Sequence, residues 1–267
     1  MPFEDVSGRG LVLLGCGKMG SALLAGWLAG GLAPSAVRVV EPDPSQWLRG
    51  TGVRLDGALP EAPAVAVVAV KPQTMGAALP AMAALGGGRT LVVSIAAGTP
   101  LAAFEAAFGP GTPVVRAMPN TPAAIGRGIT AVVGNALATE AHLALAEALL
   151  GAVGEVVRVA DEDALDAVTG LSGSGPAYVF HLIECLARAG EAEGLAPGLA
   201  LRLARATVAG AGALAQETGE APDKLRRDVT SPKGTTEAGL AVLMAELPGL
   251  VARTVRAATA RATELRG

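Results

Sequence analysis

Two short segments of this 267-residue chain combine residue types and spacings that suit the binding of anions. In the first, Gly15, Gly17 and Gly20 give the spacing G-x-G-x-x-G between an apolar run and a helical pattern. In that arrangement the first glycine permits a sharp turn, the second lets a pyrophosphate approach bare backbone, and the third lets the helix pack on the strand. Unpaired N–H groups at the helix N-terminus complete the phosphate site. The segment predicts dinucleotide binding; because the chain holds 36 glycines, a tight turn without a ligand is the alternative.

The second segment, Ser231-Pro232-Lys233-Gly234-Thr235-Thr236, is a polar turn followed by a helical pattern. It would present free backbone N–H groups and three hydroxyl groups at the start of a helix. Such an arrangement suits a carboxylate. A polar turn before a helix is also an ordinary cap, so the segment taken alone leaves both interpretations open.

An acidic residue follows the glycine turn at the distance typical of a ribose-binding carboxylate. Residues 37–41 are predicted to form the second strand, and Glu41 lies about 20 residues beyond the turn. A carboxylate there accepts hydrogen bonds from the adenosine ribose hydroxyls, which favours NADH. The surroundings of Glu41 are poor in cations for the 2′-phosphate of NADPH, although Arg49 or Lys71 could contribute. A solvated strand end is the alternative.

The next strands end in further candidates. Val65–Val70 is a continuous apolar run, as expected of a strand buried on both faces, and it ends at Lys71-Pro72. Residues 90–95 repeat the pattern and end at Ala96-Ala97, whose small side chains would let a flat ring approach. Ligands of open α/β sheets bind at the carboxyl ends of the strands, so we expect both segments near the cofactor.

A strand predicted over residues 113–117 is followed by Met118-Pro119-Asn120. Here too the residues are open to two interpretations. Pro119 could do no more than end the strand, and Asn120 could bond either the backbone or a ligand.

Strands and helices alternate in the first part of the chain, and helices alone follow. With further strands predicted at 128–133 and 154–159, the alternation predicts a mostly parallel sheet. Beyond Asp161, helical periodicity continues to the end of the sequence. The predicted fold class is α/β, with an N-terminal Rossmann-type dinucleotide-binding domain over residues 1–160 and an all-helical domain over residues 161–267. Residues 1–10 are expected to be irregular.

Composition limits the kinds of partner, metal site and cellular compartment that we expect for the chain. Hydrophobic residues make up 51% of the chain and charged residues 17%, enough apolar material for a sizeable core. The net charge of −3, without a basic run, argues against nucleic acid. Two histidines far apart exclude a multi-histidine metal site, and two cysteines suit a reducing cytoplasm. The sequence predicts neither a secretory signal nor a membrane span.

Six short segments, in order and over about residues 10–265, resemble pyrroline-5-carboxylate reductase. They are Gly15–Gly20, Val70–Pro72, Val93–Gly98, Arg116–Pro122, Leu171–Tyr178 and Val229–Thr236. The resemblance implies reduction of the cyclic imine 1-pyrroline-5-carboxylate to L-proline with NADPH or NADH, the last step of proline biosynthesis. It also implies that the helical domain forms a homodimer, and that dimers can assemble further into decamers.

The resemblance assigns roles at the substrate. Ser231 and the backbone N–H groups of Gly234 and Thr235 would hold the carboxylate. Thr236 would place its hydroxyl near the imine nitrogen as the catalytic group, and Met118 would line the cleft beside the substrate. This sparse set is sufficient because a protonated imine is already electrophilic, so hydride transfer needs orientation more than a strong base.

At the cofactor, the resemblance places Ala96 and Ala97 beside the nicotinamide. The other predicted cofactor contacts are Glu41, from its spacing after the glycine turn, and, within the resembling segments, Gly15, Cys16, Gly17, Lys18, Met19, Gly20, Val70, Lys71, Pro72 and Asn120. One residue departs from the family: Lys233 stands where a small residue, mostly glycine, is usual. If that position needs a positive φ, a lysine is strained there; otherwise its ammonium could add charge near the carboxylate.

Two other interpretations stay open. Another Rossmann-plus-helical imine or β-hydroxyacid reductase would share the architecture, but the β-hydroxyacid enzymes normally carry a lysine on the helix after Pro176, which here offers Arg188 instead. A non-catalytic NAD(P)-binding sensor would keep the glycine turn without needing Ser231–Thr236.

Overall fold

The computed structural model describes residues 4–55 and 57–266, and the chain divides into two compact units. The first, here called the sheet unit, consists of Met1–Gly173 and Ala258–Gly267. The second, the helical unit, is Ser174–Ala257. Each unit is described by itself.

The sheet unit is built on seven strands in the order β2-β1-β3-β4-β5-β6-β7. Strands β1 to β5 are parallel to their neighbours, β6 runs antiparallel to β5, and β7 is parallel to β6. The predicted mostly parallel sheet is therefore confirmed. The strands are β1 (Leu11–Leu14), β2 (Val37–Val40), β3 (Val65–Val68), β4 (Leu91–Ser94), β5 (Val114–Met118), β6 (Gly128–Gly134) and β7 (Gly154–Arg158).

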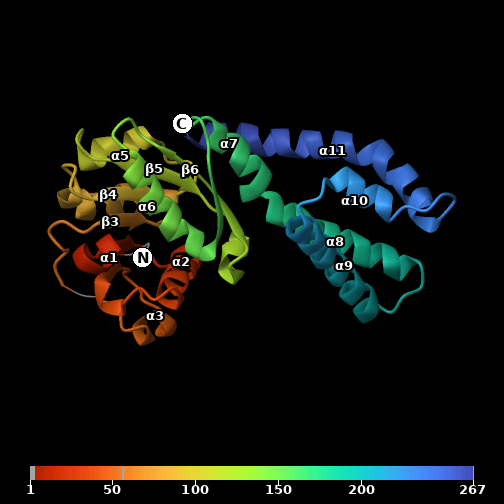
Figure 1. Cartoon of the computed structure of the whole chain (residues 1–267), viewed down its shortest axis with the longest axis horizontal. Helices are drawn as coiled ribbons and strands as arrows, with labels where there is room; N and C mark the ends of the chain where they lie inside the picture. The colour runs from red at the N-terminus through yellow and green to blue at the C-terminus, as the bar shows by residue number, and fades with distance from the viewer. Residues whose placement is uncertain (1–3, 56, 267) are drawn as a thin grey trace. The chain divides into compact units, whose positions relative to one another are not determined.

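Helices cover both faces of this sheet (Figure 1). The α-helices are α1 (Glu4–Arg9), α2 (Lys18–Ala29), α3 (Gln46–Gly50), α4 (Pro72–Ala78), α5 (Leu101–Phe108), α6 (Glu140–Leu150) and α7 (Ala164–Val168). Short 3₁₀ segments lie at η1 (Pro34–Ala36), η2 (Leu79–Leu85), η3 (Thr121–Ile125) and η4 (Gly151–Val153), and a π-helical turn, η5 (Thr169–Gly173), follows α7.

Alternation along the strands divides the core into two layers. Leu11 and Leu13 of β1 belong to one apolar cluster with residues of α2 and α6, whereas Val12 and Leu14 belong to another with residues of α4 and α5. This is the period of two expected of strands buried on both faces. Trp27 of α2 is fully buried and donates its indole N–H to Leu149 O at 2.8 Å, while Trp47 of α3 is exposed.

The expectation of an irregular segment over residues 1–10 is wrong for its described part. Residues 4–9 form α1, because Val6 is fully buried in the core. Arg9 also donates hydrogen bonds to the carbonyl oxygens of Ala62 and Pro63, which attaches the helix to the segment before β3.

Residues 164–173 are helical but pack with the sheet. Leu165 of α7 is fully buried in a small cluster with Ala131 and Val133 of β6. The predicted division after residue 160 rests on where the strands stop, and β7 does end at Arg158. Packing divides the chain further on, after Gly173, so the predicted division stays a proposal about functional domains.

The helical unit contains α8 (Gly175–Ala192), α9 (Pro197–Thr218), α10 (Pro222–Asp228) and most of α11 (Thr235–Arg266). Small residues bring α8 and α9 together: a Cβ on Gly190 would lie 3.4 Å from the Ala200 Cβ. Many large apolar side chains of this unit are exposed, among them Phe180, Leu182, Leu186, Leu203, Val242, Leu243, Met244, Leu250 and Val251.

By length and hydropathy, α11 could cross a membrane, although the sequence is expected to contain no such span. A long apolar helix of a protein that lies in no membrane meets the same criterion, so this is weak evidence. The absence of a membrane partner therefore stays a prediction.

Candidate functional site

The glycine turn has the geometry that its spacing predicts. Gly15 follows β1 with a φ of +88°, and a Cβ there would lie 2.8 Å from Val70 Cγ1 and 2.9 Å from Ala69 O. A Cβ on Gly20 would lie 2.5 Å from Gly15 O, so only glycine lets α2 pack this closely. No atom of the described residues lies within 4 Å of a Cβ position on Gly17, which leaves backbone open to a ligand.

The turn leads directly into the N-terminus of α2. Gly17 is the N-cap, no side chain caps the helix, and its first turn holds no acidic residue. The first N–H groups of a helix have no intrahelical acceptor, so they can donate to phosphate oxygens. Lys18 is exposed at this end and adds positive charge, whereas Met19 packs against the apolar core.

Glu41 lies at the edge of the same turn. Its Oε2 accepts a hydrogen bond from the Cys16 N–H at 2.7 Å, and its Oε1 accepts one from the Asp43 N–H at 3.3 Å. The structure thus brings together the predicted phosphate turn and the predicted ribose carboxylate. A contact between Glu41 and a ribose stays a prediction.

Cys16 lies half-buried inside this turn. Burial, and secondarily the negative charge of Glu41, raises the pKa of the Cys16 thiol to about 11. At neutral pH the group is therefore a neutral thiol, and a neutral thiol is not a nucleophile. The structure gives the thiol no covalent role, and the predicted contact of Cys16 with the cofactor stays a prediction.

The other predicted cofactor segments follow neighbouring strands. Lys71 is the N-cap of α4 and Pro72 is its first residue, directly after β3 and Val70. Ala96 is buried after β4, and Ala97 beside it is exposed. Since β1, β3 and β4 are adjacent and parallel, these segments lie at the same edge of the sheet as the glycine turn.

Met118 is the last residue of β5, and Asn120 follows the strand at this edge. The Asn120 side chain bonds the backbone on both sides: its Oδ1 accepts from the Ile129 N–H at 3.0 Å, and its Nδ2 donates to Ser172 O at 3.2 Å. Met118 lies against Gly173, where a Cβ would come within 2.5 Å of the Met118 Cε. Both residues thus join β5 to the π-helical turn, and their contacts with cofactor or substrate stay predictions.

The polar turn of the helical unit is closed by a hydrogen bond from the Gly234 N–H to Ser231 O at 3.0 Å. Pro232 fixes a negative φ at the second position, and Lys233 has a φ of +61° at the third. This is the pattern of a type II turn, in which the third position favours glycine. Lys233 is the only non-glycine residue with a positive φ among the residues that the structure describes, so the strained alternative raised by the sequence is the one observed.

Two backbone N–H groups of this turn already have acceptors within the chain. The Lys233 N–H donates to Glu237 Oε2 at 2.7 Å, and the Gly234 N–H closes the turn, which weakens its predicted role at a substrate carboxylate. Thr235 and Thr236 are exposed in the first turn of α11, where N–H groups have no intrahelical acceptor. With the exposed Ser231 hydroxyl, they leave this helix N-terminus suited to an anion.

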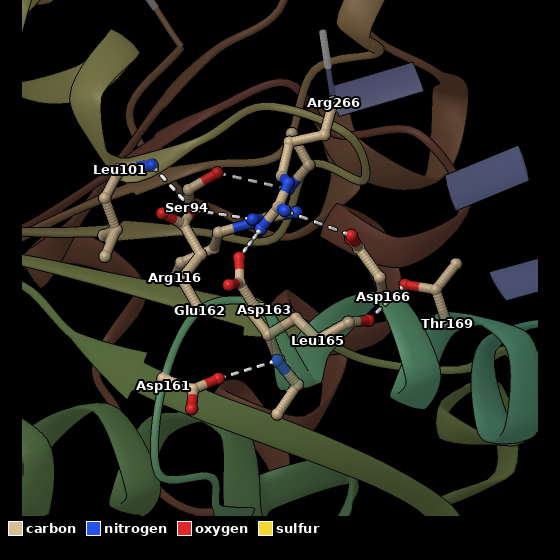
Figure 2. Close-up of polar contacts among 12 residues, drawn as sticks. Ser94, Leu101, Arg116, Asp161, Glu162, Asp163, Leu165, Asp166, Thr169 and Arg266 are labelled. Atoms are coloured by element: carbon tan, nitrogen blue, oxygen red, sulfur yellow. Dashed lines mark hydrogen bonds and ion pairs between the residues drawn. The ribbon is translucent and has the colours of Figure 1, made fainter. Parts of the chain in front are cut away.

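A charged cluster beside the cofactor edge was missed by sequence reasoning. Arg116 on β5 is buried, and its Nη1 lies 2.6 Å from Glu162 Oε1 (Figure 2). A cavity of about 140 Å³ is lined by Arg116 together with Ala97, Gly98 and Asp166. The signal was available, because a cation in the apolar strand 113–117 demands a buried partner.

The predicted site residues fall into two groups. The sheet unit holds the glycine turn, Glu41, the segments at 70–72 and 96–97, Met118 and Asn120, and the helical unit holds Ser231–Thr236. Within residues 4–55 and 57–266, no group of three or more His, Cys, Asp or Glu side chains could hold a metal ion.

Comparisons with known proteins agree with this arrangement. Residues 162–265 match the family model described as pyrroline-5-carboxylate reductase dimerisation, and residues 11–98 match NADP oxidoreductase coenzyme F420-dependent. The pyrroline-5-carboxylate reductase of Pseudomonas aeruginosa is 40% identical over 262 residues, covering 96% of each chain. The chain belongs to the pyrroline-5-carboxylate reductase family.

Further relatives extend the agreement over the whole fold. The family member of Synechocystis is 43% identical over 265 residues, covering 96% of this chain and 97% of the relative. The solved pyrroline-5-carboxylate reductase of Coxiella burnetii superposes with a TM-score of 0.92 at 33% identity, covering 97% of this chain and 99% of that one. The Plasmodium falciparum enzyme, solved with NADP bound, superposes with a TM-score of 0.83 at 26% identity over 98% and 99% of the two chains.

Proposed function

We propose that this chain reduces 1-pyrroline-5-carboxylate to L-proline by hydride transfer from NADH or NADPH, the last step of proline biosynthesis. The proposal rests on the chain's membership of the family, because the similarity to a relative covers 96% of the chain. The geometry supports it, because the sheet unit offers a phosphate turn and the helical unit offers a helix N-terminus suited to a carboxylate.

The residues of the sheet unit fit a nicotinamide dinucleotide. The bare backbone at Gly17 and the uncapped N-terminus of α2 would hold the pyrophosphate, and Glu41 would accept hydrogen bonds from the ribose. Val70–Pro72, Ala96 and Ala97 would flank the nicotinamide end. When bound, the reduced nicotinamide supplies the hydride, and the chain's own residues supply binding and orientation.

At the substrate, the chain has to hold a carboxylate and a protonated imine. Ser231 and the first N–H groups of α11, with that of Thr235 foremost, would bind the carboxylate. The Thr236 hydroxyl would form a hydrogen bond at the imine nitrogen, which keeps its proton while the imine carbon accepts the hydride. Because the protonated imine is already electrophilic, orientation carries most of the catalysis and no strong general base is needed.

Glu41 bears on the choice of nucleotide. Its carboxylate faces the glycine turn at the position expected for the ribose hydroxyls, and a 2′-phosphate placed there would be repelled by it. We therefore propose that NADH is used at least as well as NADPH.

We also infer that the chain works as a homodimer through the helical unit. Its helices expose many large apolar side chains, which a second copy would bury. Further assembly into decamers and a cytoplasmic location belong to the same proposal. We expect no nucleic-acid partner and no membrane partner.

A single assay tests the reaction and separates the alternatives. Oxidation of NADH and of NADPH is followed by absorbance with 1-pyrroline-5-carboxylate, with an exocyclic imine and without substrate. In the reverse direction, reduction of NAD⁺ and of NADP⁺ is followed with a β-hydroxyacid. We expect oxidation that depends on 1-pyrroline-5-carboxylate and yields proline. Turnover of another substrate alone would indicate a different reductase, and nucleotide binding without turnover of any of them would indicate a sensor.

A further inference from the structure

We propose that Glu162 is a positioning residue for the nicotinamide end of the site, acting through the loop between β4 and α5. This inference rests on the proposed function for its catalytic consequence. The loop consists of residues 95–100 and includes Ala96 and Ala97, the predicted neighbours of the nicotinamide. Leu101 follows that loop, and Glu162 lies 61 residues away from Leu101 in sequence. Glu162 is outside every predicted site segment.

The first observation is that α5 takes its N-terminal cap from Glu162. Pro100 occupies the N-cap position and provides no side-chain cap, and the first turn of α5 holds no acidic residue. Glu162 Oε1 accepts a hydrogen bond from the Leu101 N–H at 2.8 Å (Figure 2). A carboxylate at a helix N-terminus both satisfies an unpaired donor and complements the helix dipole. The start of α5, where the loop ends, is therefore fixed by a distant residue.

The second observation is that the same oxygen neutralises a buried cation. Glu162 Oε1 lies 2.6 Å from Arg116 Nη1, and the side chains of Arg116 and Glu162 are 4% and 24% exposed. Removing the carboxylate partner of a buried arginine is strongly destabilising, since the remaining charge cannot reach water. Arg116 pairs in register with Ser94, the last residue of β4, so it also lies next to the start of the loop.

Glu162 therefore acts on both ends of the loop. Gly98 in its middle has a φ of +73°, and one side of the loop borders the cavity of about 140 Å³ that Arg116 lines. The end of α11 lies near Gly98, where a Cβ would come within 3.3 Å of Leu265 O. Through its single oxygen, Glu162 ties the end of the loop to the strand beside its start. Hydride transfer depends steeply on the distance between the reacting atoms, so a loosened loop would lower turnover.

The test compares Glu162→Ala and Glu162→Gln with a matched control, Glu140→Ala. Glu140 also pairs with an arginine, Arg158, but Glu140 lies in the first turn of α6, and this exposed pair joins α6 to β7. Four quantities are measured: kcat and KM with 1-pyrroline-5-carboxylate, the Kd of NADH by fluorescence titration, and amide hydrogen exchange of residues 95–103.

We expect Glu162→Ala to lower kcat by about ten- to a hundredfold and to speed exchange in residues 95–103, with exchange in β1 and β3 unchanged. Glu162→Gln keeps an oxygen for the Leu101 N–H, so it should fall between Glu162→Ala and the unchanged chain. Glu140→Ala should leave all four quantities unchanged. If Glu162→Ala does not fold, the same comparison is made with Glu162→Gln alone, and faster exchange in residues 95–103 is again the expected result.

Wild-type kcat and wild-type exchange in the folded Glu162 variants would overturn the proposal. So would an equal rise in exchange throughout the sheet, because this would show a general loss of stability. Failure of the proposed function is a separate result: the wild-type chain would then not oxidise NADH with 1-pyrroline-5-carboxylate, whereas exchange and NADH affinity would still report on Glu162.

Discussion

The glycine turn and the polar turn both lead into a helix N-terminus, but they are held in different ways. The glycine turn is fixed by residues distant in sequence: Gly15 lies against Ala69 and Val70, and Cys16 donates to Glu41. The polar turn is fixed locally, by the bond from Gly234 to Ser231 and by Glu237, four residues from Lys233.

Because of this difference, we expect the two turns to tolerate substitutions differently. A side chain at Gly15 has no room because the segment after β3 lies against it, so a substitution disturbs the sheet as well as the site. The polar turn is exposed in its unit, so substitutions there should alter ligand binding and leave the fold intact. Four variants, from the largest expected effect to the smallest, test this contrast.

Gly15→Ala should abolish NADH binding and destabilise the chain by about 1–3 kcal/mol, because an L-residue is strained at a φ of +88° and its Cβ would contact Val70 and Ala69. Thermal unfolding and NADH titration measure the two effects. The control is Gly17→Ala, which has a normal φ and open space at the Cβ position. It should unfold at the wild-type temperature, and equal destabilisation of the two variants would contradict the contrast.

Thr236→Ala should lower kcat by about a hundredfold or more, as expected for loss of a group that bonds the reacting nitrogen. The unfolding temperature and the Kd of NADH should not change, because Thr236 is exposed and belongs to the locally built turn. Steady-state kinetics with 1-pyrroline-5-carboxylate measure the effect. Thr236→Ser keeps the hydroxyl and should retain most activity; unchanged turnover in Thr236→Ala would remove the residue from the mechanism.

Glu41→Gln should raise the ratio of kcat/KM for NADPH to that for NADH by about tenfold, equivalent to about 1.4 kcal/mol. The amide still accepts the Cys16 N–H but no longer repels a 2′-phosphate. Paired assays with the two nucleotides give the ratio. An unchanged ratio would show that Glu41 serves the turn without contributing to nucleotide choice.

Lys233→Gly should change the KM for 1-pyrroline-5-carboxylate by less than about tenfold. It should leave stability equal or raise it by about 1 kcal/mol, since glycine relieves the cost of a left-handed φ but loses more chain entropy on folding. Lys233→Asn removes the charge yet tolerates this conformation. If both variants lose all activity, the lysine ammonium is essential and the turn acts differently from the proposal.

Local signals explain what the sequence could predict. Glycine spacing, continuous apolar strands and helical periodicity located the sheet, the glycine turn and the helical region beyond Asp161, but they could not locate each helix: α11 runs unbroken through Pro248. The positive φ of Lys233 is one of the two alternatives that the sequence left open, because the resembling family usually has glycine at that position. In each case the sequence signal lies within a few residues, even where the contacts that hold the segment are distant.

Features that depend on contacts between residues far apart in sequence could not be predicted in the same way. α1 forms because Val6 enters the core and Arg9 reaches Ala62 and Pro63, none of which shows in residues 4–9 alone. The antiparallel direction of β6 is set by its pairing with β5. The role of Glu162 needed both of its partners, Leu101 and Arg116, to be brought together by the fold.

The low aromatic content has a practical optical consequence. Both indoles, the buried Trp27 and the exposed Trp47, belong to the sheet unit, whereas Tyr178, the single tyrosine of the chain, belongs to the helical unit. Selective excitation of tryptophan therefore reports melting of the nucleotide-binding half without contribution from the other.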